Sequence, residues 1–336
     1  MSVKLPVLKS ILSCDGIIEK ILTLYDLDID ISCRFIRQGL NDTYKIDTKD
    51  IVYYLRIYRY NWRTKEDIKS EIKLLNHLSK NKQINLSTPI KKKDGNYISN
   101  IEAPEGERYA VLFSSAVGNP SYSLNAKKCS NLGRTLGIIH SESDKLKKLD
   151  RLNIDLEHLL DDPLKRLKPY FKNNIEDFHY LENIAIKLSE RINKLLTKDK
   201  SVFGICHGDF HPGNIFMDEK DKPSVFDFDC FGYGWRAYDI SVFLWHLWVF
   251  KEIDPKQKRA KSRLWNSFLK GYQEIKPLSK DEIKAAVIFV PIRYIWLLGI
   301  HANSCNVWGA SYMESAFFKR WIKFIKSWIE HYKILP

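Results

Sequence analysis

The sequence predicts an α+β protein with two lobes, a small N-terminal lobe built on an antiparallel sheet and a larger helical C-terminal lobe. Strand-like segments gather before residue 114, long helical patterns dominate after residue 120, and a short polar segment separates the two regions. A chain of 336 residues is also too long for one small core. We therefore assign residues 1–113 to the N-terminal lobe, 114–120 to a hinge and 121–336 to the C-terminal lobe.

The N-terminal lobe carries most of the strand signals. Alternating polarity and an enrichment in β-branched and aromatic residues predict four strands, at 31–37, 43–47, 51–58 and 108–113. Apolar residues recur at helical spacing over 64–79, which predicts one helix between the third and fourth strands. Thr64 is placed to cap this helix, and Asp67 follows three residues later as in a capping box.

The C-terminal lobe is predicted to be mainly helical. Helical patterns cover residues 126–140, 177–196, 236–250, 281–301 and 312–332. Short strand-like pieces at 215–217 and 224–228 are the only ones expected in this half. The longest apolar region, 285–300, contains Pro291 and Arg293, so it is expected to form a buried helix rather than a membrane span.

Composition is typical of a soluble globular protein, with 44% hydrophobic and 28% charged residues. The six cysteines show no C-x-x-C spacing, and no sustained apolar segment lies near the N-terminus, so we expect a cytoplasmic protein with reduced thiols and no membrane partner. A net charge of +13 favours anionic partners in general. Because the lysines are scattered along the whole chain, nucleic-acid binding is not expected.

The most informative motif is His-Gly-Asp-Phe-His-Pro-Gly-Asn at 207–214, followed 13 residues later by an aspartate in Val-Phe-Asp-Phe-Asp. Phosphoryl transfer needs a carboxylate that orients the attacking hydroxyl and hard oxygen ligands for magnesium. Asp209 is the candidate base, and Asn214 and Asp227 are the candidate magnesium ligands. Taken singly, each could instead cap a turn or a strand end. Asp229 is either a second metal contact or a solvated neighbour.

The two histidines of the motif and Asp239, which follows it, have alternative interpretations. His207 and His211 are four residues apart, as in a zinc-binding helix, but the glycines and the proline of this motif are incompatible with a regular helix. We therefore expect His207 to pack and to fix the loop. Asp239 either caps the helix that it opens or supports the catalytic loop from beneath.

A nucleotide site is predicted in the N-terminal lobe. Arg56 lies in an alternating strand at a position where kinases use a lysine that contacts phosphates and pairs with a helix glutamate, and Glu71 is the candidate partner. Gly39 lies in a turn between two strands, where it either covers the nucleotide or only closes a hairpin. Ser115, in the hinge, is assigned to the same site. The chain has no G-x-x-x-x-G-K-[ST] phosphate loop.

At these residues the chain resembles the aminoglycoside phosphotransferase and choline kinase-like family, which has a protein-kinase-like fold. The similarity covers most of the chain, and its specific parts are the motif at 207–214 and the segment 227–239. The resemblance implies magnesium-dependent transfer of the γ-phosphate of ATP or GTP to a hydroxyl of a small molecule, such as an antibiotic or a metabolite. Arg56 replaces the usual lysine of the family.

The acceptor is less well defined by the sequence. Residues 231–336 hold 17 Lys and Arg against 8 Asp and Glu, which argues against a polycationic aminoglycoside. The same stretch holds eight of the nine tryptophans, which either form a box for a quaternary ammonium group or, as we favour, pack in the core. A protein Ser/Thr kinase on the same fold and a nucleotide-binding regulator without turnover stay open as alternatives. The sequence does not indicate whether the protein is a monomer or an oligomer.

Overall fold

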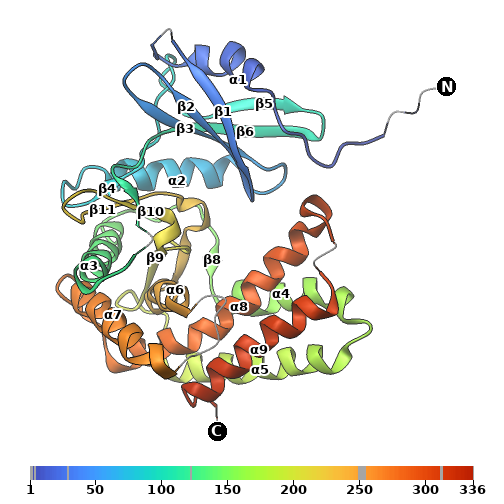
Figure 1. The fold of residues 1–336 in the computed structure, drawn as a ribbon, viewed down its shortest axis with the longest axis vertical. Helices are drawn as coiled ribbons and strands as arrows, with labels where there is room; N and C mark the ends of the chain where they lie inside the picture. Colours follow the sequence, from blue (N-terminus) through green and yellow to red (C-terminus); the bar gives the residue numbers. More distant parts are fainter. Residues whose placement is uncertain are drawn as a thin grey trace. The chain divides into compact units, whose positions relative to one another are not determined.

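The computed structural model describes residues 3, 5–28, 30–121, 123–248, 255–310 and 313–335 (Figure 1). The chain divides into two compact units. The first consists of Met1–Val117 and Lys148–Asp150, and the second consists of Gly118–Lys147 and Arg151–Pro336. The division after residue 117 falls inside the segment 114–120 that the sequence assigns to a hinge.

The first unit contains a five-stranded antiparallel sheet in the order β1-β2-β3-β6-β5. The strands of the unit are β1 (Ser32–Gln38), β2 (Asn41–Asp47), β3 (Val52–Tyr58), β4 (Asn85–Leu86), β5 (Ser99–Ala103) and β6 (Gly106–Ser114), and its helices are α1 (Cys14–Lys20) and α2 (Lys65–Leu78). All four predicted strands are present, whereas α1, β4 and β5 were not predicted. The Thr64 side chain caps α2 and the Asp67 side chain bonds back to its N–H, which completes the predicted capping box.

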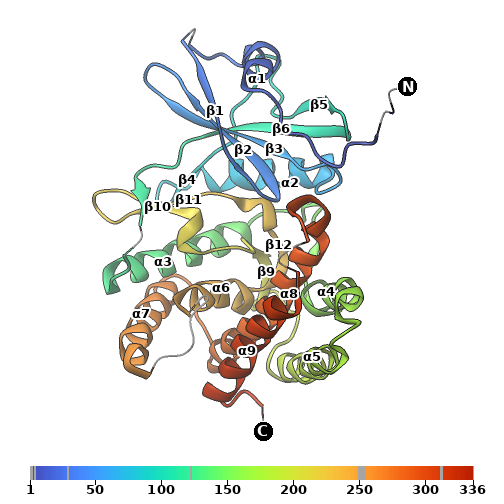
Figure 2. The same ribbon diagram turned by 45° about the vertical axis from the view of Figure 1, so that its right-hand side comes forward.

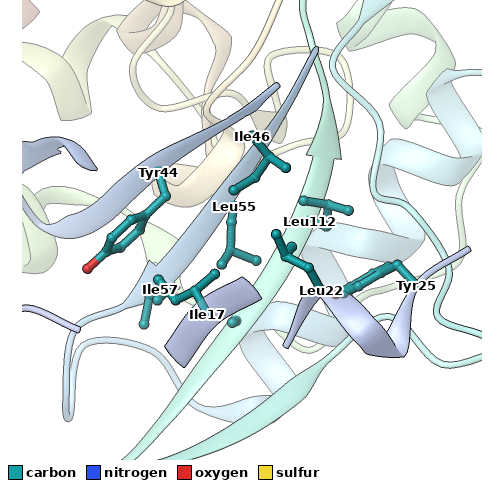
Figure 3. Close-up of a cluster of buried hydrophobic side chains, with 9 residues drawn as sticks. Ile17, Leu22, Tyr25, Tyr44, Ile46, Leu55, Ile57 and Leu112 are labelled. Carbon is teal, nitrogen blue, oxygen red and sulfur yellow. The ribbon is translucent and has the colours of Figure 1, made fainter. Parts of the chain in front are cut away.

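The core of the first unit lies between the sheet and the N-terminal segment (Figure 3). Leu55 and Ile57 on β3 point into this cluster, together with Tyr44 and Ile46 on β2 and with Ile17 on α1. Because side chains alternate along a strand, the residue between Leu55 and Ile57 points to the opposite face of the sheet. That residue is the candidate Arg56.

The second unit is mainly helical (Figure 2). Its helices are α3 (Ala126–Ser143), α4 (Asp162–Leu167), α5 (Ile175–Leu195), α6 (Arg236–Trp248), α7 (Pro255–Gln273), α8 (Lys280–Trp308) and α9 (Ser315–His331). The long helix α8 contacts α4, α5, α6 and α9 and is the centre of this unit. Helices α3 and α7 lie very close together at Gly133, where a Cβ atom would lie 1.9 Å from the Phe268 carbonyl oxygen.

The five predicted helices are all present; α8 extends seven residues beyond the predicted end at 301, and the other helices differ by three residues or fewer at the ends that the structure describes. Residues 249, 250 and 312, which the sequence assigns to two of these helices, lie outside the described residues. Helices α4 and α7 were not predicted. By length and composition α8 could cross a membrane, but 78% of its most apolar window is buried inside the protein, as in the core helix of a folded domain.

The expectation of only two strand-like pieces in the second unit was wrong. Its strands are β7 (Asn119–Pro120), β8 (Asn153–Ile154), β9 (Phe203–Cys206), β10 (Ile215–Met217), β11 (Pro223–Val225) and β12 (Gly232–Trp235). Strands of two to four residues are too short to show an alternating pattern. The segment predicted as a strand at 224–228 leaves the sheet after Val225, and Asp227 adopts a left-handed conformation with φ of 65°.

Candidate active site

The motif at 207–214 forms a loop between β9 and β10, and Gly208 determines its path. Gly208 has a φ of +81°, and a Cβ atom there would lie 2.1 Å from the carbonyl oxygen of Cys230. Any other residue would clash with this backbone and be strained. Protein kinases carry an arginine after the histidine of the equivalent motif. The close approach to Cys230 explains why this chain has glycine.

His207 fixes the loop, as the sequence predicts. Its ring is buried between Phe210 and Phe228, and its Nδ1 accepts a hydrogen bond from the backbone N–H of Asp209 at 3.3 Å. Its Nε2 lies 3.2 Å from the carbonyl oxygen of Phe226, so Nε2 carries the proton. Burial lowers the pKa of His207, consistent with this neutral tautomer. With both ring nitrogens bonded to backbone, His207 does not form a zinc site.

Asp239 supports the loop from beneath. Its carboxylate accepts the backbone N–H groups of His207 at 2.7 Å and of Gly208 at 2.8 Å. It also lies 2.9 Å from Nε2 of the buried His140, whose Nδ1 contacts the hydroxyl of Tyr272 at 2.8 Å. Burial alone would raise the pKa of Asp239, but the hydrogen bond from His140 and the backbone donors bring it below its ordinary value. The supporting role proposed for Asp239 is thus confirmed.

Asp209, the candidate base, is held by three side chains. Arg293 on α8 donates to Oδ1, the Asn214 amide donates to Oδ2 at 3.0 Å, and Nε2 of His211 lies 3.4 Å from Oδ2. Burial raises the pKa of Asp209, but the charges of His211 and Arg293 outweigh this effect and keep the carboxyl ionised. About a quarter of the side chain (25%) is exposed, so the carboxylate can contact an acceptor.

The two candidate magnesium ligands are brought together by the β10–β11 hairpin. Ile215 pairs with Val225, and the Phe226 N–H donates to the Asn214 carbonyl oxygen at 3.1 Å, so Asn214 and Asp227 lie at one end of the hairpin. The Asn214 amide nitrogen donates to the backbone and carboxylate oxygens of Asp209, both at 3.0 Å. This orientation leaves the amide oxygen as the atom that can bind a cation.

These donors fit magnesium. An amide oxygen and a carboxylate are hard ligands, and magnesium takes few protein ligands because phosphates and waters complete its shell. Asp229, two residues beyond Asp227, is buried with 3% exposure, so the interpretation as a solvated neighbour was wrong.

In the first unit, Arg56 and Glu71 form the predicted pair. Arg56 Nη1 donates to Glu71 Oε1 at 2.7 Å, and the Tyr58 hydroxyl donates to Glu71 Oε2 at 2.9 Å. The Arg56 guanidinium also lies 4.8 Å from the centre of the Phe113 ring. The arginine thus keeps the ion pair that a kinase lysine makes with its helix glutamate.

The other two candidates for the nucleotide site lie at the ends of strands. Gly39 joins β1 to β2, and a Cβ atom there would meet only ordinary contacts, so the turn does not require glycine. Ser115 follows β6, and its N–H donates to the carbonyl oxygen of Val52 at 3.2 Å. Their roles in nucleotide binding stay predictions.

Sequence reasoning missed Arg293 and His246, which both lie near Asp209. Arg293 was noted only as an interruption of an apolar helix, although a charged residue within a buried helix is itself a signal of a specific partner. The ring of His246 stacks on that of His211, with centres 5.6 Å apart and planes 7° apart.

The tryptophans of the second unit support the packing interpretation. Six of the eight are buried: Trp235, Trp245, Trp248, Trp296, Trp321 and Trp328. A buried indole contributes to the core and leaves little surface for a ligand.

The candidate base on its loop and the two candidate oxygen ligands on the adjoining hairpin, together with the Arg56–Glu71 ion pair in the first unit, are the features expected of protein-kinase-like phosphotransferases. The model of the phosphotransferase enzyme family matches residues 32–278, and the chain belongs to this family. It is therefore a phosphotransferase with a protein-kinase-like fold.

Similar proteins agree with this assignment. An uncharacterized protein from Synechocystis is 32% identical over 298 residues, which cover 88% of this chain and 80% of the relative. A homoserine kinase from Rhizobium etli is 26% identical over 297 residues, covering 82% of this chain and 84% of the relative. The solved structure of an amicoumacin kinase in complex with AMP-PNP, Ca²⁺ and Ami has a TM-score of 0.74 and 21% identity, covering 93% of this chain and 92% of that chain.

Proposed function

We propose that the protein transfers the γ-phosphate of ATP or GTP to a hydroxyl group of a small molecule, an antibiotic or a metabolite, in the cytoplasm. The geometry of Asp209 carries the proposal, because an ionised and partly exposed carboxylate is held in one orientation beside the amide of Asn214. Support also comes from relatives whose names give small-molecule acceptors, homoserine kinase and amicoumacin kinase.

In the proposed reaction, Asp209 accepts a hydrogen bond from the acceptor hydroxyl and aims its oxygen at the γ-phosphorus. The new oxygen–phosphorus bond forms as the bond to the leaving nucleoside diphosphate breaks, and the hydroxyl proton passes to Asp209. Asn214 and Asp227 would hold the magnesium ion, which neutralises charge on the phosphates when it is bound. Arg56 would contact phosphates from the sheet.

The acceptor side favours a molecule that is not a polycation. The Asp209 carboxylate is bonded to the guanidinium of Arg293 and lies beside the imidazole of His211. Together with the excess of lysines and arginines over acids in residues 231–336, they make the surroundings of the base unfavourable for several amines.

The proposal is tested by transfer of label from γ-labelled ATP, and then GTP, in the presence of magnesium and a cell extract divided into small-molecule and protein fractions. The Asp209→Asn variant keeps the shape of the side chain and is the control. We expect label in the small-molecule fraction with the parent protein, and only a residual trace with the variant.

Each other outcome has a defined meaning. Label in protein alone would favour a Ser/Thr protein kinase. Nucleotide-dependent thermal stabilisation without any transfer, including to a panel of antibiotics, would favour a regulator. Undiminished transfer by Asp209→Asn would contradict the assignment of the base.

A further inference from the structure

Arg293 is a fully buried charge in α8, a long and mainly apolar helix. Its side chain is 1% exposed, and its neighbours in α8, Ile292 and Ile295, are completely buried. Transfer of a charged group to such surroundings costs several kcal/mol unless hydrogen bonds and an opposite charge compensate it. The contacts of Arg293 therefore indicate the role of its charge.

All of the contacts described for the Arg293 guanidinium lie around the catalytic loop. Nη2 donates to Oδ1 of Asp209, and Nη1 donates to the Gly208 carbonyl oxygen at 3.3 Å and to the Tyr238 hydroxyl at 3.2 Å. The indole rings of Trp245 and Trp296 lie 4.5 and 5.4 Å from the guanidinium carbon. A planar group in contact with two indoles and bonded along its edge has one orientation available to it.

The second oxygen of the base is held independently. The Asn214 amide donates to Oδ2 of Asp209 at 3.0 Å, so the two carboxylate oxygens are bonded to different elements, α8 and the end of the β10 hairpin. Opposed bonds of this kind prevent rotation of the carboxylate about its terminal torsion, which is otherwise broad. The direction in which Asp209 accepts a proton is then fixed before the acceptor binds.

We propose that Arg293 is a positioning residue, which fixes the orientation of the Asp209 carboxylate for proton transfer from the acceptor hydroxyl. The inference rests on the proposed function and adds a residue to its machinery. Displacement of a catalytic group by about 1 Å can reduce a rate by about 100-fold. Loss of Arg293 should therefore reduce the turnover number, with little change in the KM for nucleotide.

Arg236, in the same unit, is a matched control for the loss of a buried arginine that has only a structural role. Arg236 is also 1% exposed, and it donates to the Asp144 carboxylate and to the carbonyl oxygens of Lys200 and Ser201. None of these groups belongs to the loop at 207–214. Replacement of Arg236 thus removes an equally buried charge without touching the base.

The experiment is a double-mutant cycle on the full-length protein. Arg293→Met and Arg236→Met are each made in the parent protein and in Asp209→Asn, and transfer is followed with labelled ATP for long enough to measure the residual rates. We expect Arg293→Met to lower the turnover number by about 100-fold in the parent and by less than about twofold in Asp209→Asn, because its effect passes through the base. Arg236→Met should have the same fractional effect in both backgrounds.

Arg293→Lys is included because it keeps the charge and is more certain to fold. It should recover part of the lost turnover, since lysine provides a charge but no planar fork. Equal fractional losses for Arg293→Met in the two backgrounds would overturn the inference, as would an Arg293→Met variant with full turnover.

A second cycle, on urea unfolding, separates failure of this inference from failure of the proposed function. If the parent protein transfers no phosphate to any acceptor, the proposed function fails. The cycle still decides whether Arg293 acts on Asp209, because Arg293→Met should be clearly less destabilising in Asp209→Asn than in the parent. Equal destabilisation in the two backgrounds would overturn the inference.

Discussion

Replacement of Arg56 by methionine should destabilise the protein more than replacement of its partner Glu71 by glutamine. The two side chains meet at 2.7 Å, but they are buried to different extents. The Glu71 side chain is 1% exposed, whereas that of Arg56 is 12% exposed and also contacts the Phe113 ring. Arg56→Met leaves a buried carboxylate without its cation, whereas Glu71→Gln leaves a cation that water can partly reach.

The magnitude follows from this geometry. At 2.7 Å and an effective dielectric constant of about 20, the attraction is about 6 kcal/mol before desolvation is subtracted. Removal of one partner of a buried pair costs about 3–5 kcal/mol. Because Tyr58 still donates to Glu71, we expect about 3 kcal/mol for Arg56→Met. Glu71→Gln keeps a neutral hydrogen-bonding group and should cost about 1 kcal/mol.

The assay is urea unfolding followed by circular dichroism. Arg34→Met on the same sheet is the control, because Arg34 is 64% exposed and its pair with Asp47 should contribute less than about 1 kcal/mol. The double variant Arg56→Met/Glu71→Gln should be more stable than Arg56→Met alone. If Glu71→Gln costs as much as Arg56→Met, or if Arg56→Met costs no more than Arg34→Met, the reasoning from the buried carboxylate is wrong.

Three further predictions concern the second unit and the glycine turns. Asp227→Ala should abolish the magnesium dependence of nucleotide affinity measured by calorimetry, and unchanged affinity in magnesium would contradict its role as a ligand. Gly208→Ala should lower the melting temperature more than Gly95→Ala, because both have a φ of +81° but only Gly208 faces backbone within 2.1 Å; equal shifts would show that the loop can move. Burial lowers the pKa of His140 in the folded protein. As the pH drops below about 6.5, His140 is therefore protonated in the unfolded chain before it is protonated in the folded protein, and the free energy of unfolding should fall. Urea unfolding between pH 7.5 and 5 should show a smaller decline for His140→Gln, and an identical decline would refute the assignment.

Elements with a local signal could be predicted from the sequence. The helix α2 has both an apolar stripe and a capping box at Thr64 and Asp67, and burial alternates along β2 and in the middle of β3. The Arg56–Glu71 pair followed from the same alternation, because it places Arg56 on the face opposite to Leu55 and Ile57. Local periodicity determines which face a side chain occupies, so contacts between neighbouring elements could be expected.

Elements held by tertiary contacts could not be predicted in this way. Strands β9 and β12 pair with each other although residues 207–231, which include the whole motif at 207–214, lie between them, and each strand has only four residues. Arg293 is 84 positions from Asp209, and no local pattern links them. A buried charge in an apolar helix indicates that a partner exists, but only the fold shows which one.

The contacts of Asp209 favour fixed orientation over basic strength. Arg293 and His211 lower the pKa of this carboxyl, which makes it a weaker base at rest. In phosphoryl transfer the acceptor oxygen attacks through a loose transition state, and its proton becomes acidic only late in the reaction, so a weak base suffices if it is correctly placed. A carboxylate held through both oxygens meets that requirement. The contacts of Asp209 with Arg293 and His211 are therefore compatible with the role proposed for Asp209, and loss of Arg293 should affect the orientation of the carboxylate more than its charge.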